Sequence, residues 1–98
     1  KQRRDFVVKS LNSIKGINCL TPNGAFYVFP SCKGLLNKKT KFKKDTDFVQ
    51  QLLQKSNVAV VQGSAFGLDG YFRISYATSM KNLKKAMKRI KNFCESLS

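Results

Sequence analysis

The sequence predicts an α+β domain in which a small, mostly antiparallel sheet of about three strands has helices packed on one face. The first observation is the order of its patterns. Segments with apolar residues at helical spacing and short segments rich in β-branched and aromatic residues follow one another as helix, strand, helix, strand, strand, helix. The second observation is length, because 98 residues suffice for one core and are too few for a second.

The first helix is expected over residues 4–15. Its apolar residues fall on one face at helical spacing: Phe6, Val7, Leu11 and Ile14. Gly16 follows, and a glycine at this position can end a helix because it readily adopts left-handed backbone conformations. We therefore predict a helix that packs one stripe against the core and stops at Gly16.

The strand expected over residues 25–30 has apolar side chains on both faces. Such a strand needs cover on both sides, and this chain has helices for only one. The second face is therefore predicted to be exposed or to be covered by something outside this sequence.

Residues 31–44, which come next, have no periodicity and many lysines, so they predict an exposed, mobile loop.

A second helix is predicted from Thr46 to about Lys55, with Thr46 as its N-cap and Asp47 as a favourable first-turn charge. Its buried stripe is Phe48, Val49, Leu52 and Leu53. The neighbouring Asp45 and Asp47 could instead form an acid–base pair. Helix-start chemistry is the favoured explanation of both carboxylates.

The second and third strands are predicted at residues 58–61 and 71–77. Gly63, Gly67 and Gly70 lie in the loop between them and suit backbone conformations that other residues adopt only at a cost. Glycine-rich phosphate cradles precede a helix, whereas this loop precedes a strand. We therefore do not predict a phosphate site there.

Arg73 lies in the middle of the third predicted strand. Alternation places Phe72, Ile74 and Tyr76 on one face and Tyr71, Arg73, Ser75 and Ala77 on the other. An arginine among aromatic and β-branched neighbours needs a partner for its charge, and its planar guanidinium fits a carboxylate or phosphate with two hydrogen bonds. Two explanations have similar weight: an ion pair within the domain, or a site for an anionic ligand.

The clearest helical pattern covers residues 80–97. One stripe contains Leu83, Ala86, Met87, Ile90, Phe93, Cys94 and Leu97, and Ser79 is a suitable N-cap. The opposite face has basic residues at helical spacing, and like charges this close cost about 0.2 to 0.5 kcal/mol per pair. We therefore expect packing of the apolar stripe to stabilise this helix.

Five motifs follow one another along nearly the whole chain: RRDFV, NGAFYVFPS, DFVQQLL, NVAVVQGSAFG and GYFRISYATS. In this order they resemble the C-terminal small domain of the class I and II (fold-type I) pyridoxal-phosphate-dependent aminotransferases, and most closely the bacterial aspartate aminotransferase branch. The resemblance implies that residues 1–98 are this small domain, a fragment of a longer chain. It also implies that substrate binds between the small domain and a large one.

The resemblance assigns substrate-binding roles to two residues. The arginine of the family's RIS or RLS strand, here Arg73, binds the substrate's α-carboxylate, and the phenylalanine of the GAFY motif, here Phe26, lies close to the substrate pocket. For Phe26, plain core packing is slightly favoured over a direct substrate contact. Gln62 stands where relatives commonly have proline, so the rigidity of the glycine loop is in question.

The resemblance further implies that the full-length enzyme uses pyridoxal 5′-phosphate and acts on amino-acid and 2-oxo-acid substrates as a homodimer. The family's cofactor-binding lysine, its carboxylate for the pyridine nitrogen and its phosphate site belong to the large domain. No segment of this chain matches those motifs. We therefore expect no catalytic residue, no cofactor-binding residue and no bound cofactor in this chain by itself, which is predicted to be inactive.

The formal net charge of +14 supports an alternative, a standalone basic nucleic-acid-binding module. Planar recognition of bases and phosphates favours arginine, but the arginines are only Arg3, Arg4, Arg73 and Arg89. Within the lysine-rich tract, Phe42 is the one aromatic residue available for stacking. A solvated, lysine-rich surface is the favoured explanation, so we predict no specific nucleic-acid partner.

The remaining composition indicates a cytoplasmic protein. Cys19, Cys32 and Cys94 have no metal-ligand spacing and histidine is absent, so neither a metal site nor a disulfide framework is expected. Cys94 is predicted to be a small buried hydrophobe. No apolar run is long enough to cross a membrane and no signal-peptide pattern is present. The chain starts at Lys1 within a helix-like pattern, so we expect it to be a piece of a longer protein.

Overall fold

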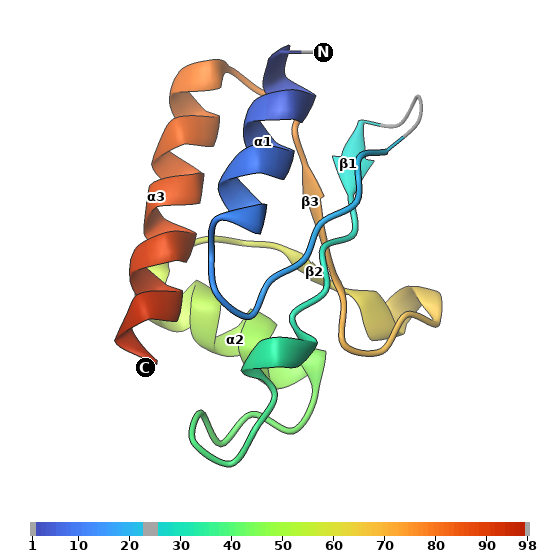
Figure 1. Ribbon diagram of the computed structural model, residues 1–98, viewed down its shortest axis with the longest axis vertical. Coiled ribbons are helices and arrows are strands. Elements are labelled where there is room, and N and C mark those ends of the chain that lie inside the picture. The colour runs from blue at the N-terminus through green and yellow to red at the C-terminus, as the bar shows by residue number, and fades with distance from the viewer. Residues whose placement is uncertain (1, 23–25, 98) are drawn as a thin grey trace.

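A computed structural model of the chain describes residues 2–22 and 26–97 (Figure 1). In these residues the α-helices are α1 (Gln2–Asn12), α2 (Asp45–Ser56) and α3 (Met80–Ser96), and the strands are β1 (Tyr27–Val28), β2 (Val61–Gln62) and β3 (Phe72–Ser75). Two 3₁₀ helices accompany them, η1 (Lys33–Leu35) and η2 (Gly63–Phe66). The order of α-helices and strands is the predicted one.

The strands form one small antiparallel sheet with β3 in the middle. The sheet order is β1-β3-β2, with Tyr27 opposite Ser75 and Val61 opposite Arg73. Figure 1 shows the three α-helices on one side of this sheet and η2 at its far edge. The structure therefore confirms the α+β class.

The strands are shorter than the sequence predicted. The first, expected over residues 25–30, contains Tyr27 and Val28, and the second, expected over residues 58–61, begins at Val61. Composition indicates where an extended chain can be buried, whereas strand ends depend on where a neighbour supplies hydrogen bonds. Residues 23–25, in the predicted turn and first strand, lie outside the described part of the chain.

The first helix ends earlier than predicted. It stops at Asn12, and Gly16 lies beyond it with a φ of +93°. The reason is the side chain of Asn12, whose amide donates to the Cys19 carbonyl (2.8 Å) and accepts from the Cys19 backbone N–H (2.7 Å). These two hydrogen bonds pair the end of the helix with the segment that leads to β1.

The start of α2 also differs from the prediction. The N-cap is Lys44 rather than Thr46, and Asp47 accepts hydrogen bonds from the backbone N–H groups of Lys43 (2.9 Å) and Lys44 (3.1 Å). These bonds hold the pKa of Asp47 below its ordinary value. Helix-start chemistry is confirmed for Asp47, while the carboxylate of Asp45 accepts a hydrogen bond from η2.

At the start of α3 the predicted N-cap is confirmed, because Ser79 Oγ accepts a hydrogen bond from the Asn82 N–H (3.2 Å).

The core lies where the helices meet the inner face of the sheet. Phe48 and Phe72 are fully buried with ring centroids 5.1 Å apart, and the ring of Phe93 lies 5.9 Å from Phe48. Ile74 and Tyr76 are also buried. The alternation predicted for β3 is therefore confirmed, with Phe72, Ile74 and Tyr76 facing the helices.

The segment over residues 31–44 is more ordered than predicted. Residues 33–35 form η1, and both Leu35 and Phe42 are buried. Thr40 Oγ1 donates to the Leu35 carbonyl (2.6 Å), and the Phe42 ring stacks on Phe93 at 6.4 Å. The expectation of a wholly exposed loop is wrong because these two apolar side chains fill space beside the helices. Phe42 is consequently unavailable as a stacking platform for bases.

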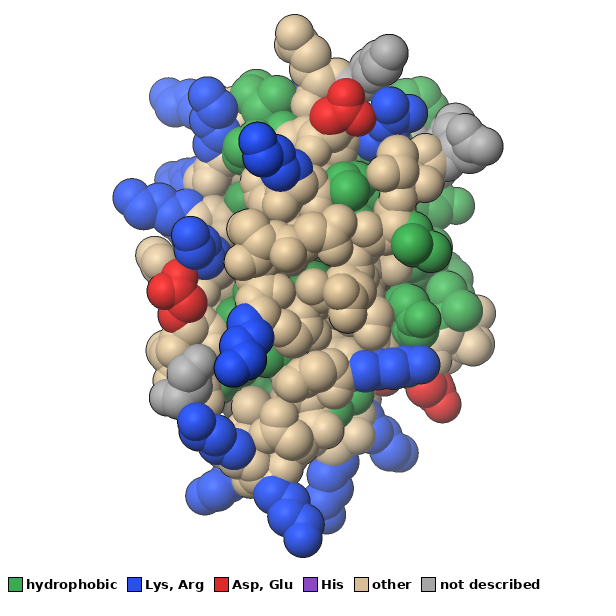
Figure 2. Space-filling view, viewed as in Figure 1, with side chains coloured by type: hydrophobic (Ala, Val, Ile, Leu, Met, Phe, Trp, Pro, Cys, Tyr) green, Lys and Arg blue, Asp and Glu red, His purple; other side chains and the backbone are tan. Residues whose placement is uncertain are grey.

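Charge and exposed apolar surface occupy different sides of the molecule. Every lysine that the structure describes is exposed, and Figure 2 shows basic side chains along the α3 side and the lower end. Hydrophobic side chains gather on the side of β1 and η2. The exposed large apolar residues include Leu20, Phe26, Tyr27, Leu53, Phe66 and Leu68. Leu53 lies on α2, so the expectation that it belongs to the buried stripe of that helix is wrong. Within the described residues, no helix combines the length and hydropathy needed to cross a membrane.

Candidate functional site

Arg73 lies at the centre of the sheet, on the face turned away from the helices. Its neighbours Phe72 and Ile74 point into the core, so the pleat of β3 directs Arg73 to the opposite face. There the side chain is half-buried. The central strand therefore fixes the position of the arginine backbone from both sides, through β1 and β2.

Two aromatic rings flank the guanidinium of Arg73. Its Cζ lies 5.2 Å from the centroid of Tyr27 and 5.0 Å from that of Phe66. Phe29 contacts both rings edge-on, at 5.6 Å in each case. A guanidinium over an aromatic face is attracted by the negative face of the ring, and the flat contact limits its rotation. Tyr27, Phe29 and Phe66 thus form an aromatic support for Arg73.

The charge of Arg73 has no carboxylate partner among the described residues. Within the described residues, the ion pair that forms is the one between Arg4 and Asp5 on α1, at 3.1 Å, and it does not involve Arg73. An internal ion pair for Arg73, one of the two explanations open from sequence, therefore finds no support. The planar donors of a half-buried guanidinium are suited to an anion that approaches the outer face of the sheet.

The loop between β2 and β3 brings Phe66 to Arg73. Its base is closed by backbone hydrogen bonds from Gly63 N–H to the Tyr71 carbonyl (2.7 Å) and from Leu68 N–H to the Gly63 carbonyl (2.8 Å). Gln62 has φ −64° and ψ 137°, and that φ is the value at which proline is fixed. The entry to the loop therefore has the conformation that a proline would impose, although glutamine occupies the position.

Phe26 is not part of the aromatic support. Its side chain is 72% exposed, which overturns the expectation that it packs in the core. The reason is its place just before β1, where its backbone carbonyl accepts from the Tyr76 N–H (2.9 Å) while the ring projects from the edge.

Sequence reasoning missed Tyr27 and Phe66. Tyr27 and Val28 are neighbours on β1 and point to different faces, but only the pairing of Tyr27 with Ser75 shows that Tyr27 shares the face of Arg73.

The three thiols are buried and lie outside this site. Desolvation raises the pKa of Cys32 to about 12, that of Cys94 to about 12 and that of Cys19 to about 11. Such thiols are protonated at neutral pH and are poor nucleophiles or metal ligands. Within the described residues no group of three histidine, cysteine or acidic side chains is placed to hold a metal ion. The prediction that Cys94 is a small buried hydrophobe is confirmed.

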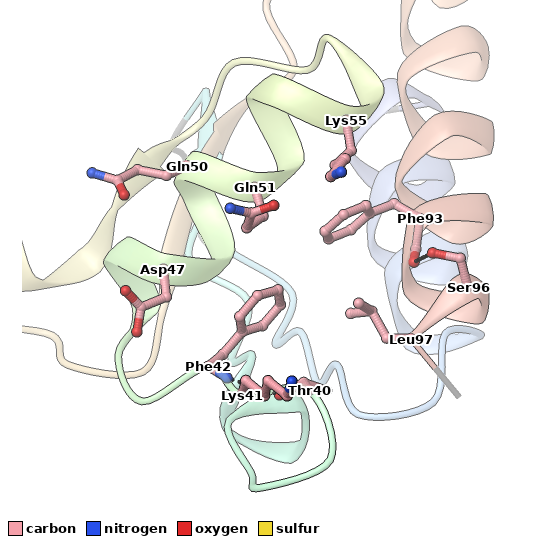
Figure 3. Close-up of a pocket in the computed structure, with 10 residues that line it drawn as sticks. All are labelled: Thr40, Lys41, Phe42, Asp47, Gln50, Gln51, Lys55, Phe93, Ser96 and Leu97. Atoms are coloured by element: carbon pink, nitrogen blue, oxygen red, sulfur yellow. Dashed lines mark hydrogen bonds between the residues drawn. The ribbon is translucent and has the colours of Figure 1, made fainter.

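A cavity of about 580 Å³ lies at another place, between residues 40–42, α2 and the end of α3 (Figure 3). The stacked rings of Phe42 and Phe93 form part of its wall, and Lys41 and Lys55 also line it. It shares no residue with the aromatic support. Each buried side-chain nitrogen or oxygen in the described residues already has a hydrogen-bond partner. The described lining of this cavity therefore has no unsatisfied buried polar atom that would indicate a ligand.

Comparison with known proteins identifies the family. The family model for aminotransferase class I and II matches residues 1–90. The chain therefore belongs to the class I and II aminotransferase family. The alternative of a nucleic-acid-binding module finds no support in the comparisons.

The relatives are enzymes about four times as long as this chain. It is 57% identical over 96 residues to a probable aspartate/prephenate aminotransferase of Rhizobium leguminosarum bv. phaseoli, covering 94% of this chain and 24% of the relative. It is 53% identical over 102 residues to the aspartate aminotransferase of Rhizobium meliloti (strain 1021), covering 100% of this chain and 25% of the relative. The chain thus spans about a quarter of the length of these curated relatives.

Solved structures give the same result. The crystal structure of the aspartate aminotransferase from Rhizobium meliloti matches with a TM-score of 0.95 and 53% identity, over 99% of this chain and 25% of that one. An alanine aminotransferase from Pyrococcus furiosus matches with a TM-score of 0.88 and 36% identity, over 97% of this chain and 23% of that one. The α+β fold described above is therefore the fold of one part of these enzymes.

The described residues do not fit pyridoxal phosphate by themselves. An enzyme lysine that reacts with carbonyl groups is activated in a desolvated or specially charged pocket. Every lysine that the structure describes is instead exposed on the surface. None of the described lysines is therefore assigned to the cofactor.

Proposed function

We propose that residues 1–98 are the C-terminal small domain of a longer pyridoxal-phosphate-dependent aminotransferase of the aspartate aminotransferase type. In this proposal Arg73 binds the α-carboxylate of the substrate. Family membership and the quarter-length match to aspartate aminotransferases support the first part. The position of Arg73 supports the second.

The observation that carries the proposal is a half-buried guanidinium that has no carboxylate partner among the described residues. Arg73 is held on the central strand, lies against Tyr27 and Phe66, and faces away from the helices. Removing a charge from water is unfavourable unless a partner compensates it. Aromatic faces compensate part of that cost and leave the planar edge of the guanidinium for an anion. An amino-acid carboxylate has the charge and planar shape that this edge accepts with two parallel hydrogen bonds.

Phe26 is retained as a second substrate contact in the proposal. Its ring is exposed at the start of β1, next in sequence to Tyr27, which contacts Arg73. A ring at this position can cover an apolar part of a ligand that Arg73 holds by its carboxylate. Its exposure also suits contact with another part of the protein.

The rest of the enzyme would supply the reaction chemistry. Pyridoxal phosphate, when bound, provides the electron sink for amino-group transfer. The proposal assigns the groups that hold it to a large domain outside these residues, across the outer face of the sheet from Arg73. Amino-acid and 2-oxo-acid substrates would bind between the two domains. A homodimer in the cytoplasm is the proposed form of the full-length protein.

The test compares wild type, Arg73→Lys and Arg73→Ala in the full-length enzyme that contains this chain. Alanine removes a desolvated, charge-assisted contact whose truncation costs about 2 to 5 kcal/mol. We therefore expect kcat/KM for amino-acid substrates to fall by about thirtyfold to a few thousandfold. Lysine should restore only part of the loss, because a point charge cannot form the planar pair. The visible spectrum of the bound cofactor should stay unchanged in all three proteins.

Two results would contradict the proposal in different ways. An alanine variant within about threefold of wild-type kcat/KM would make Arg73 a structural residue. A variant that folds but loses its cofactor spectrum would show that Arg73 binds the cofactor rather than the substrate. As a matched control, Arg89→Ala removes an arginine from α3 and should leave kcat/KM within about twofold of wild type.

A further inference from the structure

Asp45 is a charged side chain in the interior of the described structure. It is 2% exposed, at the first position of α2. A buried carboxylate requires compensation by hydrogen bonds or charge. Its Oδ2 accepts a hydrogen bond from the backbone N–H of Ser64, at 2.8 Å. Because Ser64 belongs to η2, this bond joins the start of α2 to the loop between β2 and β3.

The loop that Asp45 holds is the one that supports Arg73. Ser64 is the second residue of η2 and Phe66 is the last, and the Phe66 ring lies 5.0 Å from the Arg73 guanidinium carbon. The Gly63–Tyr71 hydrogen bond fixes the base of the loop, while Asp45 fixes η2 itself from the side of the helix. The two attachments together hold the backbone that carries Phe66, whose ring also contacts Phe29 edge-on.

We propose that Asp45 is a positioning residue for substrate binding, which anchors η2 so that Phe66 holds the Arg73 guanidinium in its binding orientation. This inference rests on the proposed role of Arg73. Asp45 touches neither substrate nor cofactor in it. The buried carboxylate acts through one hydrogen bond and one aromatic ring, and its effect is on the affinity for substrate rather than on the chemical step.

The neighbouring Asp47 provides a matched control. Both carboxylates lie in the first turn of α2, and both accept backbone hydrogen bonds. Asp47 accepts from Lys43 and Lys44, immediately before the helix, and has no bond to η2. Loss of Asp47 therefore weakens the helix start and leaves the link to the loop intact.

The experiment measures steady-state kinetics and amide hydrogen exchange in full-length Asp45→Ala, Asp45→Asn, Asp47→Ala and Arg73→Ala enzymes. In Asp45→Ala we expect KM for the amino-acid substrate to rise about tenfold, which corresponds to about 1.4 kcal/mol, with kcat little changed. Amides of residues 63–70 should exchange faster. Asp45→Asn keeps the volume and an acceptor oxygen, so its KM should lie between those of wild type and Asp45→Ala. Asp47→Ala should leave the wild-type KM and the exchange of residues 63–70 unchanged.

The outcomes separate this inference from the proposed function. Unchanged exchange of residues 63–70 in both Asp45 variants would overturn the anchoring role. Faster exchange with an unchanged KM in the Asp45 variants, while Arg73→Ala lowers kcat/KM, would overturn the positioning role and leave the proposed function standing. An equal rise of KM in Asp47→Ala would reduce Asp45 to a general contributor to helix stability and so also overturn the inference. A wild-type kcat/KM in Arg73→Ala would overturn the proposed function, and the positioning role with it.

Discussion

At the scale of single residues, burial decides which side chains are chemically available. Cys32 is fully buried, and its thiol contacts the Gly70 carbonyl at 3.4 Å. Arg73 is only half-buried, and aromatic rings rather than a carboxylate lie against it. The buried environment of Cys32 favours its neutral thiol. The half-buried environment of Arg73 keeps its permanently charged guanidinium close to solvent. The thiols therefore belong to the core, and in the proposed function the guanidinium belongs to the substrate-binding surface.

The raised thiol pKa values predict a decline of stability in alkali. The pKa of Cys94 is about 12 in the folded protein against an ordinary 9.0, so the unfolded state loses its proton first as pH rises. The contribution of this thiol to the free energy of unfolding is fully present below about pH 9. It is lost as pH rises toward about 12, at up to about 1.4 kcal/mol per pH unit. Urea unfolding between pH 8 and about 11 measures this slope.

The matched variant for this measurement is Cys94→Ala. Its free energy of unfolding should fall less steeply with pH than that of wild type, because one titrating thiol is removed. Comparing slopes rather than absolute values excludes the cost of the lost volume. Parallel curves for the two proteins would mean that Cys94 titrates normally in the folded state.

At the scale of elements, the loop between β2 and β3 is fixed by a glycine that approaches backbone closely. A Cβ added at Gly63 would collide with the carbonyl oxygens of Leu68 and Tyr71, the latter at 2.7 Å. Gly63 also donates and accepts the hydrogen bonds that close the loop. Gly67, on the same loop, has a φ of +77° and open space around it. The two glycines are therefore required for different reasons.

This difference predicts unequal effects of substitution. Gly63→Ala should lower the free energy of unfolding by about 1 to 3 kcal/mol, because backbone cannot move aside without breaking the loop closure. Gly67→Asn should cost much less, since asparagine tolerates a left-handed backbone and nothing lies near its Cβ. Chemical denaturation of both variants tests this. Equal stability of the two would show that the Gly63 turn relaxes around a methyl group.

At the scale of the whole molecule, positive charge and apolar surface are separated. Lysines cover the helical side, while the exposed apolar residues Phe26, Tyr27, Phe66 and Leu68 gather around β1 and η2. Patches of this kind commonly mark interaction sites. In the proposed function this side meets the large domain. Phe42, the aromatic residue within the lysine-rich tract, is in the core and is not available to stack on bases.

The net charge of +14 predicts weak, non-specific attraction to polyanions. Binding of the chain to DNA should fall steeply as salt is raised, because it depends on release of counterions from phosphates. Two unrelated DNA sequences and heparin, which has no bases, should behave alike in fluorescence titrations. Persistent preference for one DNA sequence at physiological salt would revive a specific nucleic-acid site.

The sequence by itself determined the features that depend on local periodicity. Alternation in β3 placed Phe72 and Ile74 on one face and Arg73 on the other. Most of the apolar stripe predicted for α3 is buried, namely Leu83, Met87, Ile90, Phe93 and Cys94. Such patterns are reliable because neighbouring residues on a strand or helix have fixed relative directions. The family motifs also predicted the family to which the chain belongs, while the substrate-binding role of Arg73 stays a prediction.

Only the tertiary structure decided what surrounds Arg73 and where the elements end. Tyr27 and Phe66 reach it from different segments, which the register of β1 with β3 and the closure of the η2 loop bring together. The link from Asp45 to Ser64 likewise joins residues far apart in the chain, so the two neighbouring aspartates of α2 have separate roles. Asn12 ends α1 through its bonds to Cys19. A single sequence contains no signal for such pairings, because they depend on distances that exist only once the chain has folded.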